Sequence, residues 1–376
     1  MNFDFTSDQH ALRDAVAKWV ERDFAFERRH ALTRQGGYTR EVYAQLCELG
    51  LGGLVISSEH GGLGMGPIEA MVVMEELGRG LVNAPYAHAA LVAPALLSPA
   101  APVAQQWLPR MASGQALVVP AFQERHARYR LHHVDTQARA TASGPVLSGH
   151  KSIVAAGDEA DAFIVSARHA GATEDHTGIG LYLVPRDAAG LQVRGYPTQD
   201  GARAAEVMFQ DTPAEVIAQE AWDTLEWAGD VGLAAACAEG VGLMEALMAL
   251  TINYMNTRKQ FGVPIASFQA LRHRLADVKM QLELGRSMSY LASLRLTEPS
   301  QTRRRALSQA KVQLGRSMRQ VGQECIQFHG GIGVTDEYVG SHYFKRLTML
   351  EMAWGDTLHH LGEVSSRMTD SAGALP

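Results

Sequence analysis

The stretch ADAFIVSARHAGATEDHTGIGLYLVP, residues 160–185, decides the fold class of this chain. Two short apolar runs flank a segment of glycine and polar residues, which is typical of two β-strands joined by a turn. Comparable runs recur at intervals of about ten residues throughout 116–212, where helical periodicity is absent. The region therefore predicts a small β-barrel or β-sandwich that ends at Pro213.

Helical patterns lie on both sides of this region. Before it, Thr6 and Gln9 form the signature of a capping box, and Pro67 stands where a later helix would begin. After it, apolar residues recur at helical spacing nearly to the end of the chain. Four helices are expected there, long enough for a bundle: 219–258, 267–295, 300–328 and 347–368.

This order of elements predicts an α+β protein with three domains. We expect an N-terminal helical domain over residues 1–115, a middle β domain over 116–215 and a C-terminal four-helix bundle over 216–376. The length of 376 residues is enough for two or three domains. Because strands and helices do not alternate and no GxGxxG follows a strand, a Rossmann dinucleotide site is disfavoured.

Composition excludes several classes of function. The net charge of −6 and the pI near 6.2 leave no basic surface for nucleic acid or anionic lipid. The three cysteines are far apart, so neither a disulfide framework nor a zinc site is expected. The first residues do not resemble a signal peptide, and no run of 18 or more apolar residues predicts a membrane span. We expect a cytoplasmic protein.

The segment YMNTRKQFGVPIASFQ, residues 254–269, is the first that could carry chemistry. A helix is expected to end near Gly262, with Pro264 resetting the chain. A cation in the last helical turn, such as Arg258, is explained by the helix dipole alone. The alternative is that the guanidinium of Arg258 makes paired, charge-assisted hydrogen bonds to a phosphate.

The segment QFHGGIG, residues 327–333, ends a later helix and is the second candidate. One glycine is explained by a C-cap with a positive φ angle. Two adjacent glycines, Gly330 and Gly331, exceed what a cap needs, and they would let the backbone approach an anion closely. The amide of Gln327 could bond a phosphate or a ribose.

Together these segments resemble the C-terminal domain of acyl-CoA dehydrogenases. The runs RKQFGVPIASFQ, QFHGGIGVTDEY and HYFKRLTMLEMAWGDT carry the resemblance, which covers essentially the whole chain and has the same helix–β–helix order. GYPTQDGARAAEV (195–207) and GSHYFKRLTM (340–349) are similar to the small subunit of the pimeloyl-CoA type of this family.

The resemblance implies an FAD enzyme that converts an acyl-CoA to a trans-2-enoyl-CoA. A carboxylate base removes the α proton while the β hydrogen leaves as hydride to the flavin, and an electron-transfer flavoprotein accepts the electrons. It also implies which residues contact FAD, several of them reaching a neighbouring subunit: Arg258, Phe261, Phe268, Gln269, Gln327, Gly330 and Gly331.

The chain departs from the family at the catalytic base. The glutamate of the family's Glu-Gly-Thr element corresponds to Trp354, and the alternative base position of some relatives corresponds to Gly232. Neither side chain can take a proton, so no catalytic residue is assigned. The nearest acids, Glu351, Asp356 and Glu239, are expected to be solvated or helix-capping carboxylates.

The β domain departs as well. The family's Thr-Glu-Pro element corresponds to the run Phe122-Gln123-Glu124-Arg125-His126, and its Trp-Ile-Thr element, which stacks on the flavin ring, corresponds to Ile153-Val154-Ala155. Ala155 has no hydroxyl group to offer the flavin. The flavin-ring pocket is therefore expected to be degraded, although the residues that reach the diphosphate are present.

Four interpretations remain open. In the first, the chain is a subunit without the base, in a hetero-oligomer whose larger homologous subunit supplies the glutamate. In the second, it is a self-sufficient homotetramer with an atypical base such as Glu351 or Glu239. In the third it is a non-catalytic scaffold, and in the fourth an oxidase-like flavoenzyme. His329 and His342 flank the glycine motif without a third ligand at a suitable spacing, so no metal is expected.

Overall fold

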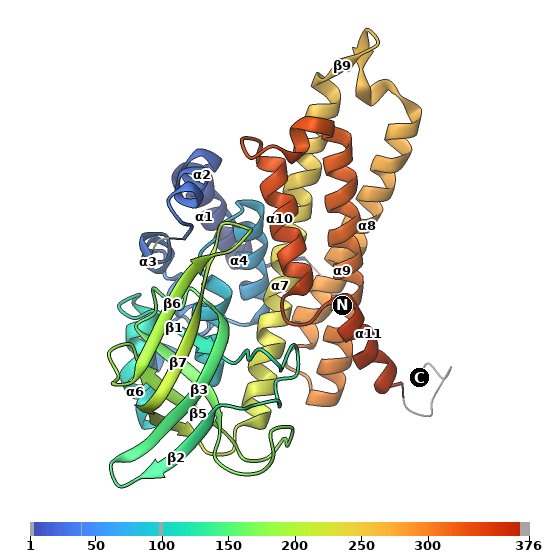
Figure 1. Ribbon diagram of the computed structural model, residues 1–376. Coiled ribbons are helices and arrows are strands. Elements are labelled where there is room, and N and C mark those ends of the chain that lie inside the picture. Colours follow the sequence, from blue (N-terminus) through green and yellow to red (C-terminus); the bar gives the residue numbers. More distant parts are fainter. Residues whose placement is uncertain (1–3, 39, 98–100, 369–376) are drawn as a thin grey trace. The chain divides into compact units, whose positions relative to one another are not determined.

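The computed structural model describes residues 4–38, 40–97 and 101–368. It divides into two compact units, each described here by itself. The helical unit comprises the chain up to Arg29, Pro67–Val82 and the chain from Leu233 onward, and the β unit comprises His30–Gly66 and Asn83–Gly232. Figure 1 shows the long helices of the first unit and the twisted sheet of the second.

The helical unit is a bundle of long helices. α7 and α9 are largely buried, and α8 packs along α9. The bounds of its helices are α1 Ser7–Asp23, α4 Pro67–Arg79, α7 Trp222–Thr257, which begins before the unit boundary at Leu233, α8 Gln269–Arg295, α9 Ser300–His329, α10 Val339–Met352 and α11 Thr357–Ser366. Two short 3₁₀ segments, η4 Ile265–Ser267 and η5 Gly330–Val334, lie at helix ends.

Glycines allow α4 and α7 to approach each other closely. A Cβ atom on Gly78 would lie 2.3 Å from the carbonyl oxygen of Glu239, and one on Gly242 would lie 1.9 Å from the carbonyl oxygen of Glu75. Neither distance is compatible with a side chain. The backbones therefore pack directly, which fixes the acidic residues of α4 against the bundle core.

The sequence predicted most of this unit. Thr6 and Gln9 form the expected capping box at the start of α1, and α4 begins at Pro67. The helix expected over 347–368 is wrong in two respects, because α10 begins earlier, at Val339, and because the helix is broken, with α10 ending at Met352 and α11 beginning at Thr357. The break is a turn in which Gly355 has a φ of 103°.

The β unit contains one eight-stranded mixed sheet in the order β6-β7-β3-β2-β4-β5-β8, with β1 paired to β4. β1 and β2 run parallel to β4, and the other neighbours are antiparallel. The strands are β1 Val118–Ala121, β2 Gln137–Thr141, β3 Gly144–Ala155, β4 Ala162–Arg168, β5 Ile179–Pro185, β6 Leu191–Pro197, β7 Arg203–Pro213 and β8 Glu215–Ala218. The predicted fold class is confirmed, while β2 and β8 were not anticipated.

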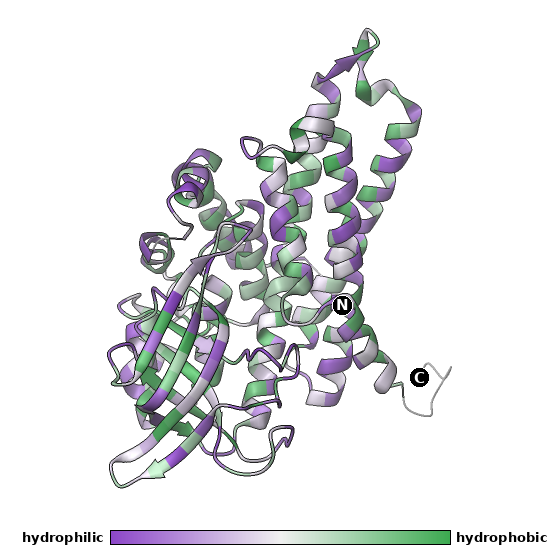
Figure 2. Ribbon diagram, viewed as in Figure 1, coloured by the Kyte–Doolittle hydropathy of each residue, from purple (hydrophilic) through white to green (hydrophobic). Residues whose placement is uncertain are grey.

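Burial explains which strands the sequence revealed. Every residue of β4 is buried, as expected for a central strand, whereas β6 alternates between exposed and partly buried positions. Figure 2 shows hydrophobic and hydrophilic segments following one another along the strands. The remaining helices of this unit are α2 Phe26–Arg34, which begins just before the unit boundary, α3 Arg40–Glu48, α5 Ala93–Leu96 and α6 Pro102–Ala112, together with η1 Leu51–Gly53, η2 Ser58–His60 and η3 Ala87–Val92.

One helix of the described residues, α7, is long and apolar enough to cross a membrane by length and composition alone. Its most apolar 18-residue window has a mean hydropathy of 1.6, although no uninterrupted apolar run of that length exists. Within the structure 78% of that window is buried. This burial is what the central helix of a folded bundle shows.

Candidate cofactor site

The end of α7 presents a free cation. The helix ends at Thr257, and the backbone N–H of Arg258 still donates to the carbonyl oxygen of Tyr254, 2.8 Å away. The side chain of Arg258 is exposed. It makes no hydrogen bond or ion pair with any residue that the structure describes, so its guanidinium is available to a ligand.

A two-strand hairpin follows and carries an exposed aromatic side chain. β9 Lys259–Gln260 pairs with β10 Val263–Pro264, and the two turn residues, Phe261 and Gly262, have φ angles of 54° and 83°. Two successive positive φ angles are the signature of a type I′ turn. The side chain of Phe261 is 91% exposed. A phenylalanine in this conformation costs about 1 kcal/mol or more, although its side chain is almost fully exposed.

The start of α8 lies beside this hairpin. Phe268 is the N-cap residue of α8, and its ring centroid is 6.1 Å from that of Phe261 in an edge-to-face arrangement. Gln269 is the first residue of the helix and is exposed. The helix expected over 219–258 thus ends close to the end of α7 at Thr257, and the corner expected near Gly262 is a two-strand hairpin that precedes α8.

The end of α9 presents two glycines and an amide. Gln327 is exposed, whereas Phe328 and His329 are buried. Gly330 has φ 61° and ψ −138°, a conformation that essentially only glycine adopts. A Cβ atom on Gly331 would meet nothing within 4 Å. The packing of this chain thus gives no reason for a glycine at position 331, which leaves its backbone open to a group from outside.

Tyr254 joins these two corners. Its hydroxyl donates a hydrogen bond to the carbonyl oxygen of His329 at 3.3 Å, and the two rings are 4.6 Å apart. Arg274 of α8 pairs with Glu324 of α9 at 2.7 Å and lies over the ring of Phe328. The ends of α7 and α9 and the start of α8 therefore lie at one end of the bundle, where the β9 hairpin projects in Figure 1. Sequence reasoning did not assign Tyr254 a role.

The position expected for a catalytic glutamate lies in the turn between α10 and α11. Trp354 is half-buried and has a φ of 58°. The buried ammonium group of Lys311 donates to the carbonyl oxygens of Glu351, Ala353 and Gly355 at 2.9, 2.7 and 2.6 Å. Burial lowers the pKa of Lys311 to about 8. Lys311 thus holds the turn that presents Trp354, and no periodic pattern in the sequence pointed to it.

The acids considered as alternative bases are engaged elsewhere. The carboxylate of Glu351 accepts from the hydroxyl of Thr357 at 2.7 Å and from Arg319 at 3.3 Å. Asp356 caps α11 by accepting from the N–H of His359 at 2.8 Å.

The third acid, Glu239, forms a two-bond ion pair with Arg346 at 2.5 and 2.8 Å. Gly232, the other base position, is buried within α7. The expectation of solvated or helix-capping carboxylates is therefore correct for Asp356, which is a cap, and wrong for Glu351 and Glu239, which are buried and paired.

The segment expected at a flavin ring lies on β3. Ile153 is 61% exposed and has a φ of 56°, at an irregularity in the pairing of β3 with β7 between Lys151 and Val154. Ser152 donates to Glu206 at 3.0 Å, while Ala155 offers only a methyl group. The bulge presents a side chain outward, but that side chain is aliphatic and the hydroxyl is missing.

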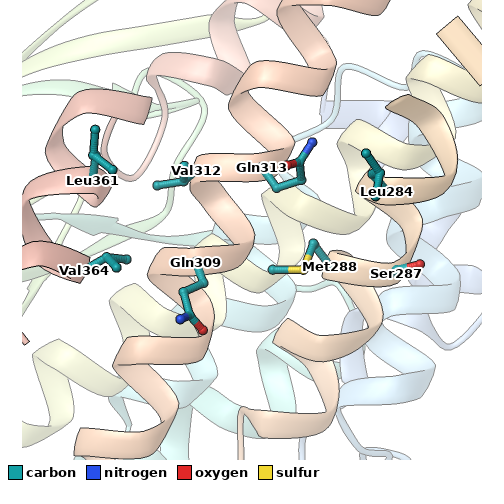
Figure 3. A pocket seen from close by; sticks show the side chains of 8 residues that line it. All are labelled: Leu284, Ser287, Met288, Gln309, Val312, Gln313, Leu361 and Val364. Atoms are coloured by element: carbon teal, nitrogen blue, oxygen red, sulfur yellow. The ribbon is translucent and has the colours of Figure 1, made fainter. Parts of the chain in front are cut away.

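A separate groove of about 370 Å³ lies on the helical unit (Figure 3). Its lining is Leu284, Ser287 and Met288 of α8, Gln309, Val312 and Gln313 of α9, and Leu361 and Val364 of α11. Gln313 precedes Gln327 by 14 residues, about 21 Å along α9 at 1.5 Å per residue. The groove is therefore distinct from the corner described above, and its apolar walls carry no chemistry.

Comparison with known proteins identifies the family. The N-terminal, middle and C-terminal domains of acyl-CoA dehydrogenases match residues 6–115, 121–212 and 222–369. The chain is 26% identical to the probable acyl-CoA dehydrogenase YngJ of Bacillus subtilis, over 94% of this chain and 96% of that protein. It is 31% identical to L-prolyl-(peptidyl-carrier protein) dehydrogenase of Pseudomonas fluorescens, over 68% of this chain and 71% of that protein.

Its fold is also that of a solved relative. The ChsE4–ChsE5 complex of Mycobacterium tuberculosis contains a chain that superimposes with a TM-score of 0.87 at 24% identity, over 100% of both chains. Members of the matched family use FAD to dehydrogenate acyl-CoA substrates. The chain belongs to the acyl-CoA dehydrogenase family of oxidoreductases.

Proposed function

We propose that this chain is the subunit without the catalytic base in a hetero-oligomeric, FAD-dependent acyl-CoA dehydrogenase. A larger homologous subunit supplies the glutamate and the flavin-ring pocket. This chain supplies Arg258, Gln327 and the open backbone of Gly331 to an FAD that lies across the subunit boundary. Electrons pass to an electron-transfer flavoprotein, and the assembly works in the cytoplasm.

The observation that carries the proposal is the side chain at the base position. Trp354 cannot accept a proton, and Glu351, Asp356 and Glu239 each hold a structural partner. Using Glu351 or Glu239 as a base would disturb the hydrogen bond from Thr357 or the two-bond ion pair with Arg346. A self-sufficient homotetramer is disfavoured for this reason.

Exposure at the corner supports a contact with another subunit. Phe261 is 91% exposed and Val334 is 73% exposed, on the hairpin and next to the glycine motif respectively. Large apolar side chains left exposed on the hairpin and beside the glycine motif support an interaction site. An edge-to-face aromatic contact with Phe268 already orients Phe261 outward.

The donor set at the corner fits a diphosphate. A guanidinium makes paired, charge-assisted bonds to phosphate oxygens, an amide adds a neutral donor, and a glycine backbone admits the anion without a clash. The ring pocket of the β unit does not fit equally well, because Ala155 cannot donate a hydrogen bond and Ile153 replaces an aromatic ring. This contrast supports a chain that holds one end of an FAD whose ring lies in a partner.

The proposal assigns each group a step. The partner's carboxylate takes the α proton of the acyl-CoA. FAD, when bound, supplies the acceptor for the β hydrogen as hydride. Arg258 neutralises the diphosphate and fixes the position of the cofactor, so that its ring meets the substrate in one orientation. Trp354 contributes no proton transfer.

A relative of the same fold supports an assembly of two kinds of chain, since ChsE4 forms a complex with ChsE5. The substrate class is an acyl-CoA. The pimeloyl-CoA type is the specific candidate that the sequence resemblance offers, so the assay should compare pimeloyl-CoA with butyryl-CoA and octanoyl-CoA.

The test is to purify the chain alone and together with its larger homologue, and to measure FAD per assembly and reduction of an electron acceptor with each acyl-CoA. We expect FAD and activity only in the two-chain assembly. Full activity of the lone chain would show that it has its own base and would overturn the proposal.

Arg258→Ala in the assembly tests the corner directly, with Lys259→Ala as the matched control, since Lys259 is the next exposed cation of the chain. We expect Arg258→Ala to lose FAD on gel filtration and Lys259→Ala to retain it. Equal retention by both variants would reduce Arg258 to a helix-end cation.

A further inference from the structure

Two loops of the β unit are joined by one buried arginine. The loops span 122–136, between β1 and β2, and 169–178, between β4 and β5. Arg168, which is 1% exposed, donates to the carbonyl oxygens of His132 and Val134 in the first loop and of Thr173, Asp175 and Thr177 in the second, at 2.9 to 3.2 Å. The loops are thereby held against each other.

His133 lies between these loops with one ring nitrogen paired and the other unpaired. Its Nδ1 atom is 2.6 Å from a carboxylate oxygen of Glu174, which also accepts from Arg130 at 2.8 Å. Because a carboxylate only accepts, Nδ1 carries a proton, and Nε2 is the ring nitrogen left to face a ligand. The Nε2 atom is buried and makes no hydrogen bond with any residue described by the structure. The side chain of His133 as a whole is 11% exposed.

Two carboxylates face this nitrogen. Asp135 has an oxygen 3.4 Å from Nε2, and its side chain is 54% exposed, so it is free to adjust. Glu124 is buried and fixed: one oxygen accepts from Lys151 at 2.6 Å and from the hydroxyl of Thr136 at 2.8 Å, and the other accepts only the N–H of Asp135, at 2.7 Å. The second oxygen of Glu124 therefore keeps a free lone pair.

We infer that His133, Asp135 and Glu124 bind a divalent cation of the zinc type. One ligand atom from each residue lies within 4.8 Å of the other two. Two ligands bound tetrahedrally at about 2.1 Å from Zn²⁺ lie about 3.4 Å apart, and the measured separation of Nε2 from the Asp135 oxygen is 3.4 Å. Rotation of the exposed Asp135 side chain would bring its carboxylate into the coordination shell of the ion.

The chemistry of the donors selects the ion. One imidazole and two carboxylates suit Zn²⁺, Mn²⁺ or Co²⁺ better than the all-oxygen sites of Mg²⁺ and Ca²⁺. The Glu174 carboxylate behind Nδ1 is the usual outer partner of a metal-bound histidine, since it fixes the tautomer and orients the ring. Three protein ligands leave the outward position to water.

Local charge permits the ion. Glu124, Asp135 and Glu174 bring three negative charges, while Lys151 and Arg130 bring two positive charges, each already directed at a carboxylate. The ammonium group of Lys151 next to Glu124 weakens the attraction for a cation. The bound ion would therefore stabilise the contact between the two loops, with a lower affinity than a four-ligand zinc site and without a redox role.

Nothing in the sequence announced this site, and none was expected. Asp135 stands two residues and Glu124 nine residues from His133, in an irregular loop where no helical or CxxC-type spacing applies. The argument uses no residue of the Arg258 corner, so the inference stands independently of the proposed function.

The full chain, in the form in which it is purified, is treated with EDTA and titrated with ZnCl₂ by calorimetry and with CoCl₂ by visible absorption. We expect one saturable site and a Co²⁺ spectrum of low coordination number. His133→Ala and Asp135→Asn should abolish both signals, and Glu174→Gln should weaken binding about 10- to 100-fold.

His126→Gln is the matched control, because His126 is an exposed histidine of the same loop outside the ligand group. It should bind like the unmodified chain. His133→Ala removes a mostly buried side chain and could unfold the loop. Asp135→Asn changes an exposed side chain, so its loss of metal binding cannot be attributed to unfolding. No saturable binding, or equal binding by the unmodified chain and Asp135→Asn, would overturn the inference.

Discussion

The hydroxyl of Tyr254 donates a hydrogen bond to the carbonyl oxygen of His329, 3.3 Å away, with the two rings 4.6 Å apart. Tyr254 stands four residues before Arg258, and His329 stands two residues after Gln327. This contact therefore sets the relative position of the two segments that we propose to hold the diphosphate. The relative position of the two segments thus depends on Tyr254, a residue that carries no charge and belongs to no recognised motif.

Tyr254→Phe tests this dependence. The variant keeps the ring packing and loses one hydrogen bond, which is worth about 1 kcal/mol in the free energy of unfolding. We expect that loss in urea denaturation, together with weaker FAD retention in the assembly. Tyr338→Phe is the control, because the Tyr338 ring also packs on His329, 5.0 Å away, while its hydroxyl makes no hydrogen bond with any residue that the structure describes. Equal effects of the two variants would contradict the role of the Tyr254 hydroxyl.

Gly330 and Gly331 should respond differently to substitution. Gly330→Ala forces a side chain into φ 61°, ψ −138° and should destabilise the fold by about 1–3 kcal/mol. Gly331→Leu adds a side chain into open space, so the melting temperature should hardly change while the assembly loses FAD. Retained FAD in Gly331→Leu would show that nothing approaches this backbone.

Local patterns were enough for the fold class and for the two candidate corners. β4 is recognisable because its residues up to Ala167 are apolar or small and buried, and α9 because its buried residues recur at helical spacing. The motifs around Arg258 and Gln327 lie at helix ends, where glycine and proline mark the boundaries. Each of these features depends on residues close together in the chain.

Features that depend on distant partners could not be predicted. The break after Met352 is stabilised by Lys311, whose ammonium group donates to the carbonyl oxygen of Gly355, 44 positions later. No sequence pattern links two residues so far apart. The cluster around His133 needs Glu174 from another loop and Arg168 to align the two. Helical and strand periodicities describe one element at a time, so they contain no information about such pairs.

Lys311→Met tests the break. The variant leaves the carbonyl oxygens of Glu351, Ala353 and Gly355 without their common donor in a buried place, and about 2–5 kcal/mol of stability should be lost. The control is Lys279→Met, which removes an exposed ion pair with Glu283 worth about 0.5 kcal/mol. A similar, small change in both urea midpoints would mean that the turn is held by something else.

Trp354→Glu places a carboxylate where the family has its base. If this chain lacks a competent flavin-ring pocket of its own, the lone variant should still fail to reduce an electron acceptor with any acyl-CoA. The reason is that Ala155 supplies no hydroxyl and Ile153 no aromatic face. A gain of activity in the lone variant would show that only the base was missing. Trp354→Gln, of similar size and without the charge, is the control.

Glu75 on α4 should make the stability of the helical unit depend on pH. Its side chain is 1% exposed, and neither carboxylate oxygen accepts a hydrogen bond among the described residues. Burial raises the pKa of Glu75 from 4.5 to about 7, and the negative charge of Glu245 adds to this rise. Arg286 and Arg13, whose nearest nitrogens lie 3.8 Å away, act in the opposite direction and lower the pKa. The carboxyl group is therefore best accommodated in its neutral form.

The sign follows from proton binding. Between pH 4.5 and about 7 the folded state holds a proton on Glu75 that the unfolded state has released, so this group's contribution to stability falls as the pH rises and stays low above pH 7. Glu75→Gln removes that loss. At pH 8 it should be more stable than the unmodified chain by up to about 3 kcal/mol, with little difference near pH 4.5.

Urea unfolding of both proteins at pH 5 and pH 8 measures the effect as a difference of differences, which cancels the titration of all other groups. Glu21→Gln, at an exposed carboxylate of α1, should show no such difference. A variant that loses stability at pH 8 would mean that Glu75 is charged and held by Arg13 and Arg286. In that case the buried network of α1, α4 and α8 would be an ion-pair cluster, and the close packing of α4 on α7 at Gly242 would rest on charge rather than on a neutral carboxyl.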